Sequence, residues 1–489
     1  MNLIYWLVLI VLLLAAYYVW NALYGLPSDL PPGPSGWTRL PLIGSLLSTR
    51  ADLHVQFQEW AKIYGPIFHV QMATKLFIVL SDAKLVKEAF SRDDFAGRPH
   101  TNINDYYTED LKYGVLFSQG PAWKENRRFS LTCLRDFGMG RFTMEAKIME
   151  EVTVLLDILE QEDRHSGFDV HNHLGVSVSA IISSLVFGKH FTHDDPYFVR
   201  FLDCMNRLAK AITPDASNFI PGISLLPNSN FRKFKTHYNE LKTDFYEEEI
   251  AEHKARLDTE NPRDFIDVYL TKMIELRKAG KHTTFSGWRR QVSLLHTNHI
   301  HQVFAVKKHR MWQRIVWWMK LYVQEELDRV IGRSRLPCLN DQASLLYTQA
   351  TLLEVFRRSS VVPLGVFHAA VKETTLAGYR IPEGAIIGPN LWGIHHDPAL
   401  WQNPNEFQPE RFLDSDGNLM KPDTLLPFST GLRACIGELL ARQEAFLFFA
   451  SVLQKFNLVP PEGGPVPEDS GLLSLVLAPK PYKMRAIVR

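Results

Sequence analysis

The chain has 489 residues, of which 46% are hydrophobic, and it carries 54 basic against 53 acidic side chains. That length can bury a large core and, taken alone, would suggest two or three domains. The near-zero net charge argues against a general nucleic-acid binder. The four cysteines lie far apart without a CxxC pair, which argues against a disulfide framework or a cysteine zinc site and indicates a reducing compartment.

The N-terminal segment is almost wholly apolar. Residues 3–20 contain only apolar or aromatic side chains, and the first charged residue is Asp29. A signal peptide would have a basic start and a small-residue cleavage site, which are missing here. The length is close to one bilayer crossing, with Tyr and Trp at its end that suit the interface. We therefore expect an uncleaved transmembrane anchor over 1–22, rather than a cleaved or buried helix, and a proline-rich hinge over 23–40.

The body of the chain, residues 41–489, has a mainly helical pattern. Two β-rich runs around a Thr-Lys turn, Pro66 to Leu80, predict a hairpin, and Thr375 to Ile387 predicts strand, turn and strand. The uncharged loop Asn218–Pro227 is either a buried connector or a second patch that touches the membrane. Apolar residues at helical spacing predict helices over 144–161, 231–256, 324–332, 346–359 and 438–456, and 397–430 reads as a long ordered coil.

The strongest motif is PFSTGLRACIG, residues 427–437. Cys435 lies in a glycine-flanked loop at the predicted N-terminus of the last helix, with Arg433 two residues before it. The helix dipole, free backbone N–H groups and a nearby cation stabilise a thiolate, and the glycines allow the backbone to approach a flat ligand closely. Together with Phe428 and Gly437 the loop has the pattern F-x-x-G-x-R-x-C-x-G. It resembles the cytochrome P450 family, in which a cysteine thiolate can hold a haem iron.

Two further motifs resemble the same family. Glu354 and Arg357 form E-x-x-R, one helical turn apart and so on one face. With Arg411 in PERF they resemble the buried Glu–Arg–Arg triad of the family, which locks the coil behind the haem. Trp123 and Arg127 in WKENR match its W-x-x-x-R helix, which meets a haem propionate.

Three more residues stand where family members carry propionate partners: Arg98, His368 and Arg433. Charge-assisted hydrogen bonds from cations to a carboxylate are the strong ones. For each of these residues the alternative is a surface cation or a core histidine. The resemblance thus implies a cofactor site made of Arg98, Trp123, Arg127, His368, Phe428, Arg433, Cys435 and Gly437, with Cys435 as the axial ligand of the iron.

The resemblance implies a cytochrome P450 fold, a single, mainly helical, triangular domain with small β-sheets. The anchor, the hinge and the motifs look like the microsomal monooxygenases that hydroxylate steroids, fatty acids and xenobiotics. Such enzymes carry haem b and take two electrons from NADPH through a flavoprotein reductase, with cytochrome b5 as a further partner, and they bind no nucleic acid. They insert one oxygen atom of O2 into the substrate and release the other as water. The implied location is the endoplasmic reticulum membrane, with one N-terminal anchor and the catalytic domain facing the cytosol.

Contacts with partner and substrate are also expected from the resemblance. Apolar side chains for a lipophilic substrate are predicted around Thr101–Phe117, Asn218–Pro227, Val361–Val366 and Leu472–Leu477. Four cations are either docking points for an acidic reductase or ordinary solvated surface: Lys124, Arg128, Lys421 and Arg442.

One segment departs from the family pattern. Residues 287–320 contain seven Lys or Arg, four His, four Trp and no acid. They fill the position of the distal helix, where the family carries A/G-G-x-D/E-T for proton delivery. A buried helix could not hold so many unpaired cations. The nearest similar sequence, Ala279 to Thr283, has His in the place of the acid and lies in a polar stretch, so we find no intact acid–alcohol pair.

Three interpretations of 287–320 are open. A metal site at His296, His299 and His301 would lack an acidic ligand in the segment, and a basic membrane or nucleic-acid element would need exposure that the position does not offer. The interpretation we favour is a wrong reading frame or a mis-joined exon. Two other functions therefore remain beside the monooxygenase: a haem-thiolate isomerase or dehydratase that needs no reductase, and a defective, haem-binding non-enzyme.

Overall fold

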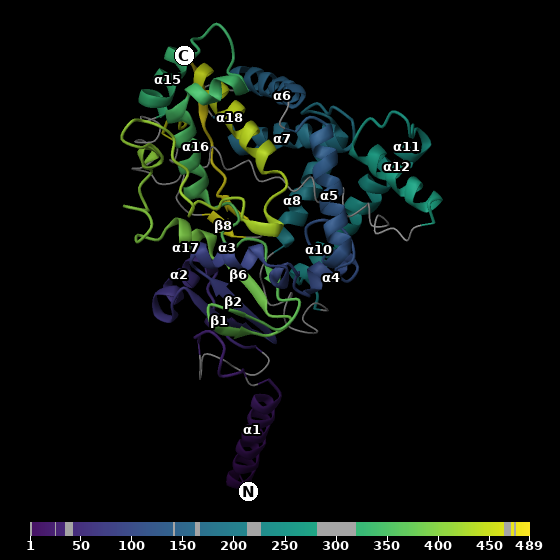
Figure 1. Cartoon of the computed structure of the whole chain (residues 1–489), viewed down its shortest axis with the longest axis vertical. Coiled ribbons are helices and arrows are strands. Elements are labelled where there is room, and N and C mark those ends of the chain that lie inside the picture. The colour runs from purple at the N-terminus through teal and green to yellow at the C-terminus, as the bar shows by residue number, and fades with distance from the viewer. Residues whose placement is uncertain are drawn as a thin grey trace.

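The computed structural model describes residues 2–24, 26–34, 43–139, 142–161, 167–212, 226–280, 319–463, 471–473 and 476–489. Over these ranges the chain is mainly helical with small sheets, as predicted (Figure 1). Most of the anomalous segment 287–320 and most of Asn218–Pro227 lie outside the described residues.

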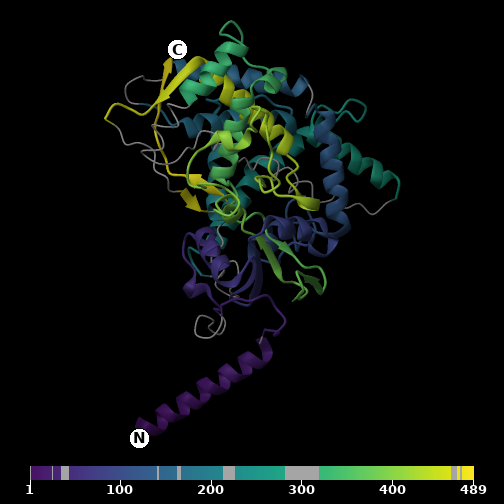
Figure 2. The ribbon, with the colours of Figure 1, turned by 60° about the vertical axis from the view of Figure 1, so that its left-hand side comes forward.

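The N-terminal helix stands apart from the body. Helix α1 (Asn2–Tyr24) projects away from the other elements in both views (Figures 1 and 2). Its large apolar side chains from Ile4 to Val19 are exposed. Within the described ranges, no helix combines the length and apolarity that a bilayer crossing requires.

The helices of the body form where the sequence combines apolar periodicity with an N-terminal cap. Asp82, Asp169, Asp195 and Asp264 each accept a hydrogen bond from a backbone N–H in the first turn of α3, α7, α8 and α12, which satisfies donors that a helix end otherwise leaves free. The helices after α1 are α2 (Leu53–Tyr64), α3 (Ala83–Ser91), α4 (Asn102–Thr108), α5 (Gly120–Asp136), α6 (Phe142–Gln161), α7 (Val170–Val186), α8 (Pro196–Ala211), α10 (Asn230–Leu241), α11 (Glu247–Ala255), α12 (Phe265–Lys278), α15 (Gln324–Val330), α16 (Leu346–Ser359), α17 (Leu391–His395) and α18 (Glu438–Lys455).

Short helical turns join several of these helices. The predicted helix 231–256 is continuous but contains a π turn, η5 (Lys242–Tyr246), between α10 and α11. A second π turn, η8 (Met319–Val323), leads into α15. The remaining turns are 3-10 turns: η2 (Leu46–Ser48), η3 (Asp93–Phe95), η9 (Leu339–Ser344), η10 (Pro409–Phe412) and η11 (Gly431–Arg433).

The largest sheet lies between α1 and the helical body (Figure 1). Its strand order is β1-β2-β6-β3, with β2 and β6 parallel and the other pairs antiparallel. The predicted hairpin is present, but its turn is Ala73–Thr74 rather than Thr-Lys, and Ala73 takes a left-handed φ of 53°. The strands are β1 (Ile67–Met72), β2 (Lys75–Leu80), β3 (His368–Ala369), β4 (Thr374–Leu376), β5 (Tyr379–Ile381), β6 (Ile386–Pro389), β7 (Phe456–Val459), β8 (Gly471–Leu473), β9 (Leu477–Pro479) and β10 (Arg485–Val488).

Helix α18 lies at the centre of the helical body and positions the site. Thirteen of its residues, Leu440 and all of 443–454, are buried, because α6, α15 and α16 pack around it. The apolar run from Ala445 to Phe449 explains why the sequence buries this helix on all sides. Its N-terminus, directly after the cysteine loop, is thereby fixed within the core.

Candidate active site

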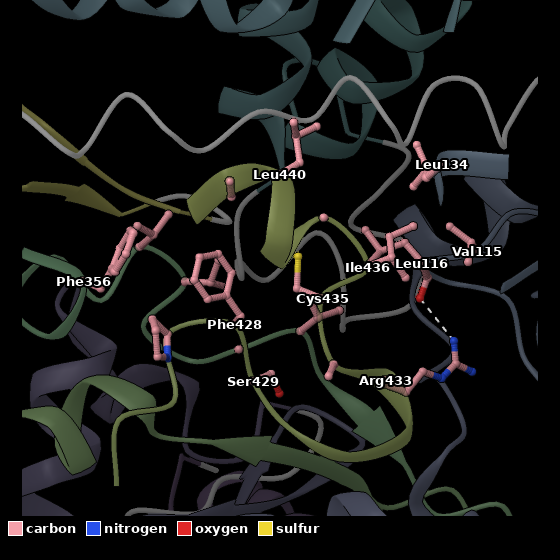
Figure 3. Close-up of a pocket in the computed structure, with 18 of the residues that line it drawn as sticks. Val115, Leu116, Leu134, Phe356, Phe428, Ser429, Arg433, Cys435, Ile436 and Leu440 are labelled. Carbon is pink, nitrogen blue, oxygen red and sulfur yellow. Dashed lines mark hydrogen bonds between the residues drawn. The ribbon is translucent and has the colours of Figure 1, made fainter. Parts of the chain in front are cut away.

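The cysteine loop forms one wall of a cavity of about 320 Å³. In Figure 3 the sulfur of Cys435 points into this space, and the side chain is exposed there. The polar lining residues among those described are Arg98, Arg127, Ser359, His368, Ser429, Arg433, Cys435 and Glu444, and the rest of the lining is largely apolar.

Backbone geometry holds the loop in place. The Cys435 N–H donates to the Phe428 carbonyl at 3.0 Å, and α18 begins three residues later with Gly437 as its N-cap. Gly431 has a φ of 74°, and a Cβ there would collide with the Phe90 carbonyl oxygen, so glycine is required. Gly437 is different, since its φ is −94° and a Cβ would meet only the Cys435 sulfur at 4.0 Å. The protein atoms alone therefore do not require glycine at position 437. A flat ligand that fills the cavity would require it, because the ligand would occupy the space of a Cβ atom.

Three buried or half-buried arginines line the cavity, and no ion pair to a carboxylate is found for any of them among the described residues. The Arg433 guanidinium donates to the Ala96 and Ser118 carbonyls at 2.7 Å each. The Arg98 guanidinium donates to the carbonyls of Leu116 and Phe367, and Arg127 to that of Ala434.

These arginines raise each other's electrostatic energy. Burial, followed by the charges of Arg98 and Arg127, lowers the pKa of Arg433 to about 7. Burial and the charge of Arg127 lower the pKa of Arg98 to about 9. Burial also lowers the pKa of Arg127. Buried cations without an acid are costly, so the cavity favours an anionic ligand beside them.

Trp123 and His368 complete the polar wall. The Arg433 guanidinium lies 3.6 Å from the centre of the Trp123 ring, and the buried indole Nε1 has no hydrogen-bond partner among the described residues. The His368 ring stacks on Phe90 with a centroid distance of 3.7 Å, and its Nδ1 lies 2.8 Å from the Phe95 carbonyl oxygen. Burial, followed by the charge of Arg98, lowers the pKa of His368 well below its usual range, so this imidazole is neutral.

The cation that acts on the Cys435 sulfur is not the one that the sequence suggested. The sequence suggested Arg433, but its guanidinium turns toward the backbone of Leu116 and away from the sulfur (Figure 3). Arg127 is the cation that favours the Cys435 thiolate. Burial nevertheless raises the pKa of Cys435, against the opposing effects of the Gly437 backbone and Arg127. The loop lowers the pKa of this thiol through the Gly437 backbone and Arg127 but does not offset burial, whereas a coordinating metal ion deprotonates a thiol outright.

The structure brings the predicted Glu–Arg–Arg residues together. The guanidinium of Arg357 donates to both carboxylate oxygens of Glu354 at 2.7 Å, and Arg411 Nε lies 3.2 Å from Glu354 Oε2. Arg357 also donates to the carbonyls of His395 and Pro404 at 2.6 and 3.0 Å. These bonds tie α16 to the coil that precedes the cysteine loop.

The predicted substrate segments reach the cavity in part. Val115, Leu116 and four residues of Val361–Val366 line it, whereas none of the described residues of Leu472–Leu477 does. Sequence reasoning missed an apolar wall from α5, the turn after it and α7, namely Leu134, Met139, Ile182, Leu185 and Val186. Helical spacing marks these residues as apolar, but it does not separate a cavity wall from ordinary core. Phe428 lines the cavity, with its ring centroid 5.5 Å from that of Phe356.

Known proteins are similar to this chain over most of its length. The family described as Cytochrome P450 matches residues 34–297 and 320–486. Cytochrome P450 18a1 of Drosophila melanogaster is 36% identical over 477 residues, which cover 93% of this chain and 86% of that protein. Cytochrome P450 2U1 of Rattus norvegicus is 36% identical over 487 residues, covering 93% and 90%, and cytochrome P450 2C8 of Homo sapiens is 36% identical over 456 residues, covering 88% of each.

The chain belongs to the cytochrome P450 family. It is a monooxygenase by family, and its cofactor is haem b, as the resemblance implied. The relatives do not favour the isomerase or dehydratase alternative. The residues present fit the haem. A cysteine faces a largely apolar cavity, its three arginines pair with no acid in the described part of the chain, and Gly437 leaves space beside the sulfur.

Proposed function

We propose that the chain is a haem-thiolate monooxygenase of lipophilic substrates, with Cys435 as the axial ligand of the iron. The observation that carries the proposal is the position of the Cys435 sulfur in an apolar cavity whose wall contains three arginines. The haem supplies the activation of O2, which an electron-donating thiolate favours. One oxygen atom enters the substrate and the other leaves as water.

The other polar residues have binding roles in this proposal. Arg98, Arg127 and Arg433 balance the two propionates of the haem with their charges, and the free indole N–H of Trp123 and the neutral His368 add hydrogen bonds. The Glu354 cluster contributes rigidity, because it fixes the coil from which the cysteine loop emerges.

The substrate class follows from the cavity wall. Apolar side chains from the loop before α5, from α5 and α7, and from the turn after α16 make most of its surface apolar. Burial of apolar surface therefore supplies the binding free energy, at roughly 25 cal/mol per Å². Steroids, fatty acids and lipophilic xenobiotics are the substrates that fit this chemistry.

The electrons in this proposal come from NADPH through a flavoprotein reductase, with cytochrome b5 as a further donor. Of the four cations predicted to dock the reductase, Lys124 pairs with Asp93 at 2.9 Å and Arg442 with Glu438 at 2.8 Å. Arg128 and Lys421 are exposed. These last two are the better docking points, because binding an acidic surface breaks no described ion pair of theirs.

The proposed location is the endoplasmic reticulum membrane. The exposed apolar side chains of α1 find no cover on the body of the protein (Figure 2), and apolar surface of this kind is stable in lipid. Full-length protein should float with phospholipid vesicles in a density gradient. A chain that starts after the hinge should show much weaker flotation, and equal flotation of both would remove this role from α1.

The segment 287–320 is proposed to come from a wrong reading frame or a mis-joined exon. The family match stops at residue 297 and resumes at 320, so 298–319 lie outside it. Translation of this interval in the other two frames should give an apolar helix with A-G-x-E/D-T. If neither frame gives one, the explanation loses its main support.

A carbon-monoxide difference spectrum of the reduced protein tests the proposed function. Wild-type protein with haem should give the Soret band of a thiolate-ligated haem, and Cys435→Ala should lose it. Cys133→Ala is the matched control, since Cys133 is buried and does not line the cavity. Turnover with NADPH, reductase and a panel of steroids and fatty acids then tests the reaction. A retained thiolate band in Cys435→Ala would exclude Cys435 as the ligand.

A further inference from the structure

His395 is the last residue of α17 and lies in the core, with 0% of its surface exposed. Its Nδ1 lies 2.9 Å from Ser360 Oγ, and its Nε2 accepts a hydrogen bond of 2.9 Å from the Leu426 N–H. Its backbone carbonyl accepts a bond of 2.6 Å from the guanidinium of Arg357. One residue thus joins the end of α16 to the coil that leads into the cysteine loop.

These contacts fix the position of the proton on the ring. A backbone N–H can only donate, so Nε2 carries no proton, and the one proton of the neutral imidazole is on Nδ1. Nδ1 therefore donates to Ser360 Oγ, whose own O–H donates to the Arg357 carbonyl at 2.9 Å. Burial, followed by the charge of Arg357, lowers the pKa of His395 to about 3. The ring is therefore neutral, and the same donors and acceptors operate throughout the physiological pH range.

The contact with Leu426 leads directly to the cysteine loop. The Leu426 carbonyl accepts from the Ser429 N–H at 3.1 Å, and the Phe428 carbonyl accepts from the Cys435 N–H at 3.0 Å. Pro427, Phe428 and Ser429 line the cavity. The imidazole therefore holds the point at which the loop enters the cavity wall.

The contact with Ser360 leads to another part of the same wall. Ser360 follows α16 and takes a left-handed φ of 39°, which is uncommon for a residue with a side chain. Its hydroxyl is bonded both to the imidazole and to the Arg357 carbonyl, and these two bonds stabilise the turn. Ser359, Val361 and Val362, on either side of it, line the cavity. The turn therefore sets the direction in which the valines enter the cavity.

We propose that His395 is a positioning residue that sets the spacing between the cysteine loop and the substrate-facing turn 361–366. The inference rests on the proposed function. The side-chain bonds of Arg357 end at the carbonyls of residues 395, 404 and 406, and the imidazole extends this anchorage to Leu426. The ring does not line the cavity. It acts on the iron ligand through Leu426 and on the apolar wall through Ser360.

Two substitutions separate the two contacts. In His395→Asn the amide N–H can take the position of Nδ1 and keep the bond to Ser360, but the Leu426 N–H loses its acceptor. In His395→Gln the amide oxygen can take the position of Nε2 and keep the bond to Leu426, but the bond to Ser360 is lost. Loss of one hydrogen bond shifts an equilibrium roughly twofold to tenfold.

The carbon-monoxide difference spectrum of the reduced protein measures the cysteine side. His395→Asn should lower the ratio of the thiolate band to the shorter-wavelength band of haem without a thiolate ligand by roughly twofold to tenfold. His395→Gln should keep the wild-type ratio, because its bond to Leu426 holds the loop in place.

Spectral titration with phenylimidazole measures the substrate side. This probe binds the iron through a nitrogen and places its phenyl ring in the cavity. His395→Gln and Ser360→Ala should weaken its binding by roughly twofold to tenfold, since both lose the bond that stabilises the turn. The thiolate-ligated fraction of His395→Asn should bind it as the wild type does.

His396→Asn is the matched control, because it changes a neighbouring buried histidine outside this network. The His396 ring stacks on Trp392 with a centroid distance of 4.2 Å, and its Nδ1 lies 2.9 Å from the Trp392 carbonyl oxygen. It is not among the described residues that line the cavity. This variant should unfold at a lower denaturant concentration but keep the wild-type ratio of bands and the wild-type affinity for phenylimidazole.

The outcomes separate this inference from the proposed function. If the wild type gives the thiolate band but His395→Asn and His395→Gln change neither readout more than His396→Asn does, or change both equally, His395 is only structural and the proposed function stands. If both variants fail to bind haem, Ser360→Ala decides, and an unchanged affinity for phenylimidazole overturns the inference. If the wild type with haem gives no thiolate band, the proposed function fails, and the positioning role fails with it.

Discussion

Arg357 and Arg433 are both buried, with 0% and 7% of their surface exposed, but their charges are balanced in different ways. Arg357 makes two hydrogen bonds of 2.7 Å to the carboxylate of Glu354. Arg433 has only carbonyl oxygens and the Trp123 ring around its guanidinium in the described structure. The positive charges of Arg98 and Arg127 repel that of Arg433, and no described carboxylate offsets this repulsion.

The difference separates a structural cluster from a binding site. The Glu354 cluster is complete without a ligand, since acid, cations and backbone carbonyls satisfy one another. The Arg433 cluster is electrostatically incomplete, because backbone dipoles offset only part of three positive charges. An anionic ligand completes it, and the two propionates of haem b have the required charge. Removal of a cation from the Glu354 cluster should therefore lower the stability of the fold. Removal of a cation from the Arg433 cluster should instead weaken haem binding.

The largest effect is expected from Arg357→Ala. The change removes the positive charge that pairs with the buried Glu354 carboxylate. It also leaves the carbonyl oxygens of His395 and Pro404 without the hydrogen bonds from Arg357. Breaking a buried pair in this way costs about 3–5 kcal/mol of unfolding free energy. Denaturant unfolding of the haem-free protein measures it. Arg256→Ala, which removes an exposed partner of Glu252, is the control and should cost much less. An equal loss in both variants would contradict a special role for the Glu354 cluster.

A smaller and different effect is expected from Arg433→Leu. The haem-free protein should keep most of its stability, because the variant loses bonds to Ala96 and Ser118 but also a buried positive charge. Haem binding should weaken by about 1.5–3 kcal/mol, the value of a hydrogen bond to a charged group, or roughly tenfold to a hundredfold. Spectrophotometric titration of the haem-free protein with haem measures this.

Arg433→Lys sharpens the same test. Lysine keeps the charge but loses the planar, forked set of donors, so its haem affinity should lie between those of wild type and Arg433→Leu. If Arg433→Leu lowers the stability as much as Arg357→Ala and leaves haem affinity unchanged, the two clusters do not differ as we infer.

The sequence predicts those features that depend on short spacings. Glu354 and Arg357 lie one helical turn apart, so any helix through them places both on one face, and α16 has the predicted bounds. The cysteine loop is likewise local, since Gly431 must take a positive φ and α18 must start just after Cys435. The repeat of apolar residues also predicts the ends of α6 and α18 to within two residues.

Features that depend on distant partners were not predictable. Arg433 was expected to favour the thiolate, because it is two residues from Cys435 in sequence, and to pair with a propionate. Carbonyls of Ala96 and Ser118, more than 300 residues away, orient its guanidinium. The π turn η5 has no signal in the periodicity.

The smallest effect concerns a buried ion pair whose cation can be removed by pH. His253 Nε2 lies 3.0 Å from Asp264 Oδ2 at the α11–α12 junction, and both are buried. Burial lowers the pKa of His253, but the hydrogen bonds to Asp264 and to the Glu249 backbone, with the charges of Asp264 and Asp267, together outweigh it, and the net pKa is raised above 6.5. The folded protein thus holds this proton more tightly than the unfolded chain. The resulting stability is fully present below pH 6.5 and is lost as the pH rises through the pKa of the folded state.

His253→Gln should therefore lose more unfolding free energy at pH 6 than at pH 8, as denaturant curves across this range would show. Asp264→Asn keeps a side-chain oxygen that can cap α12, and it should abolish the same pH-dependent part. In the double variant the pH-dependent losses should not add, because both changes remove one interaction. A loss in His253→Gln that grows with pH would reverse the sign and show that burial, not Asp264, controls this imidazole.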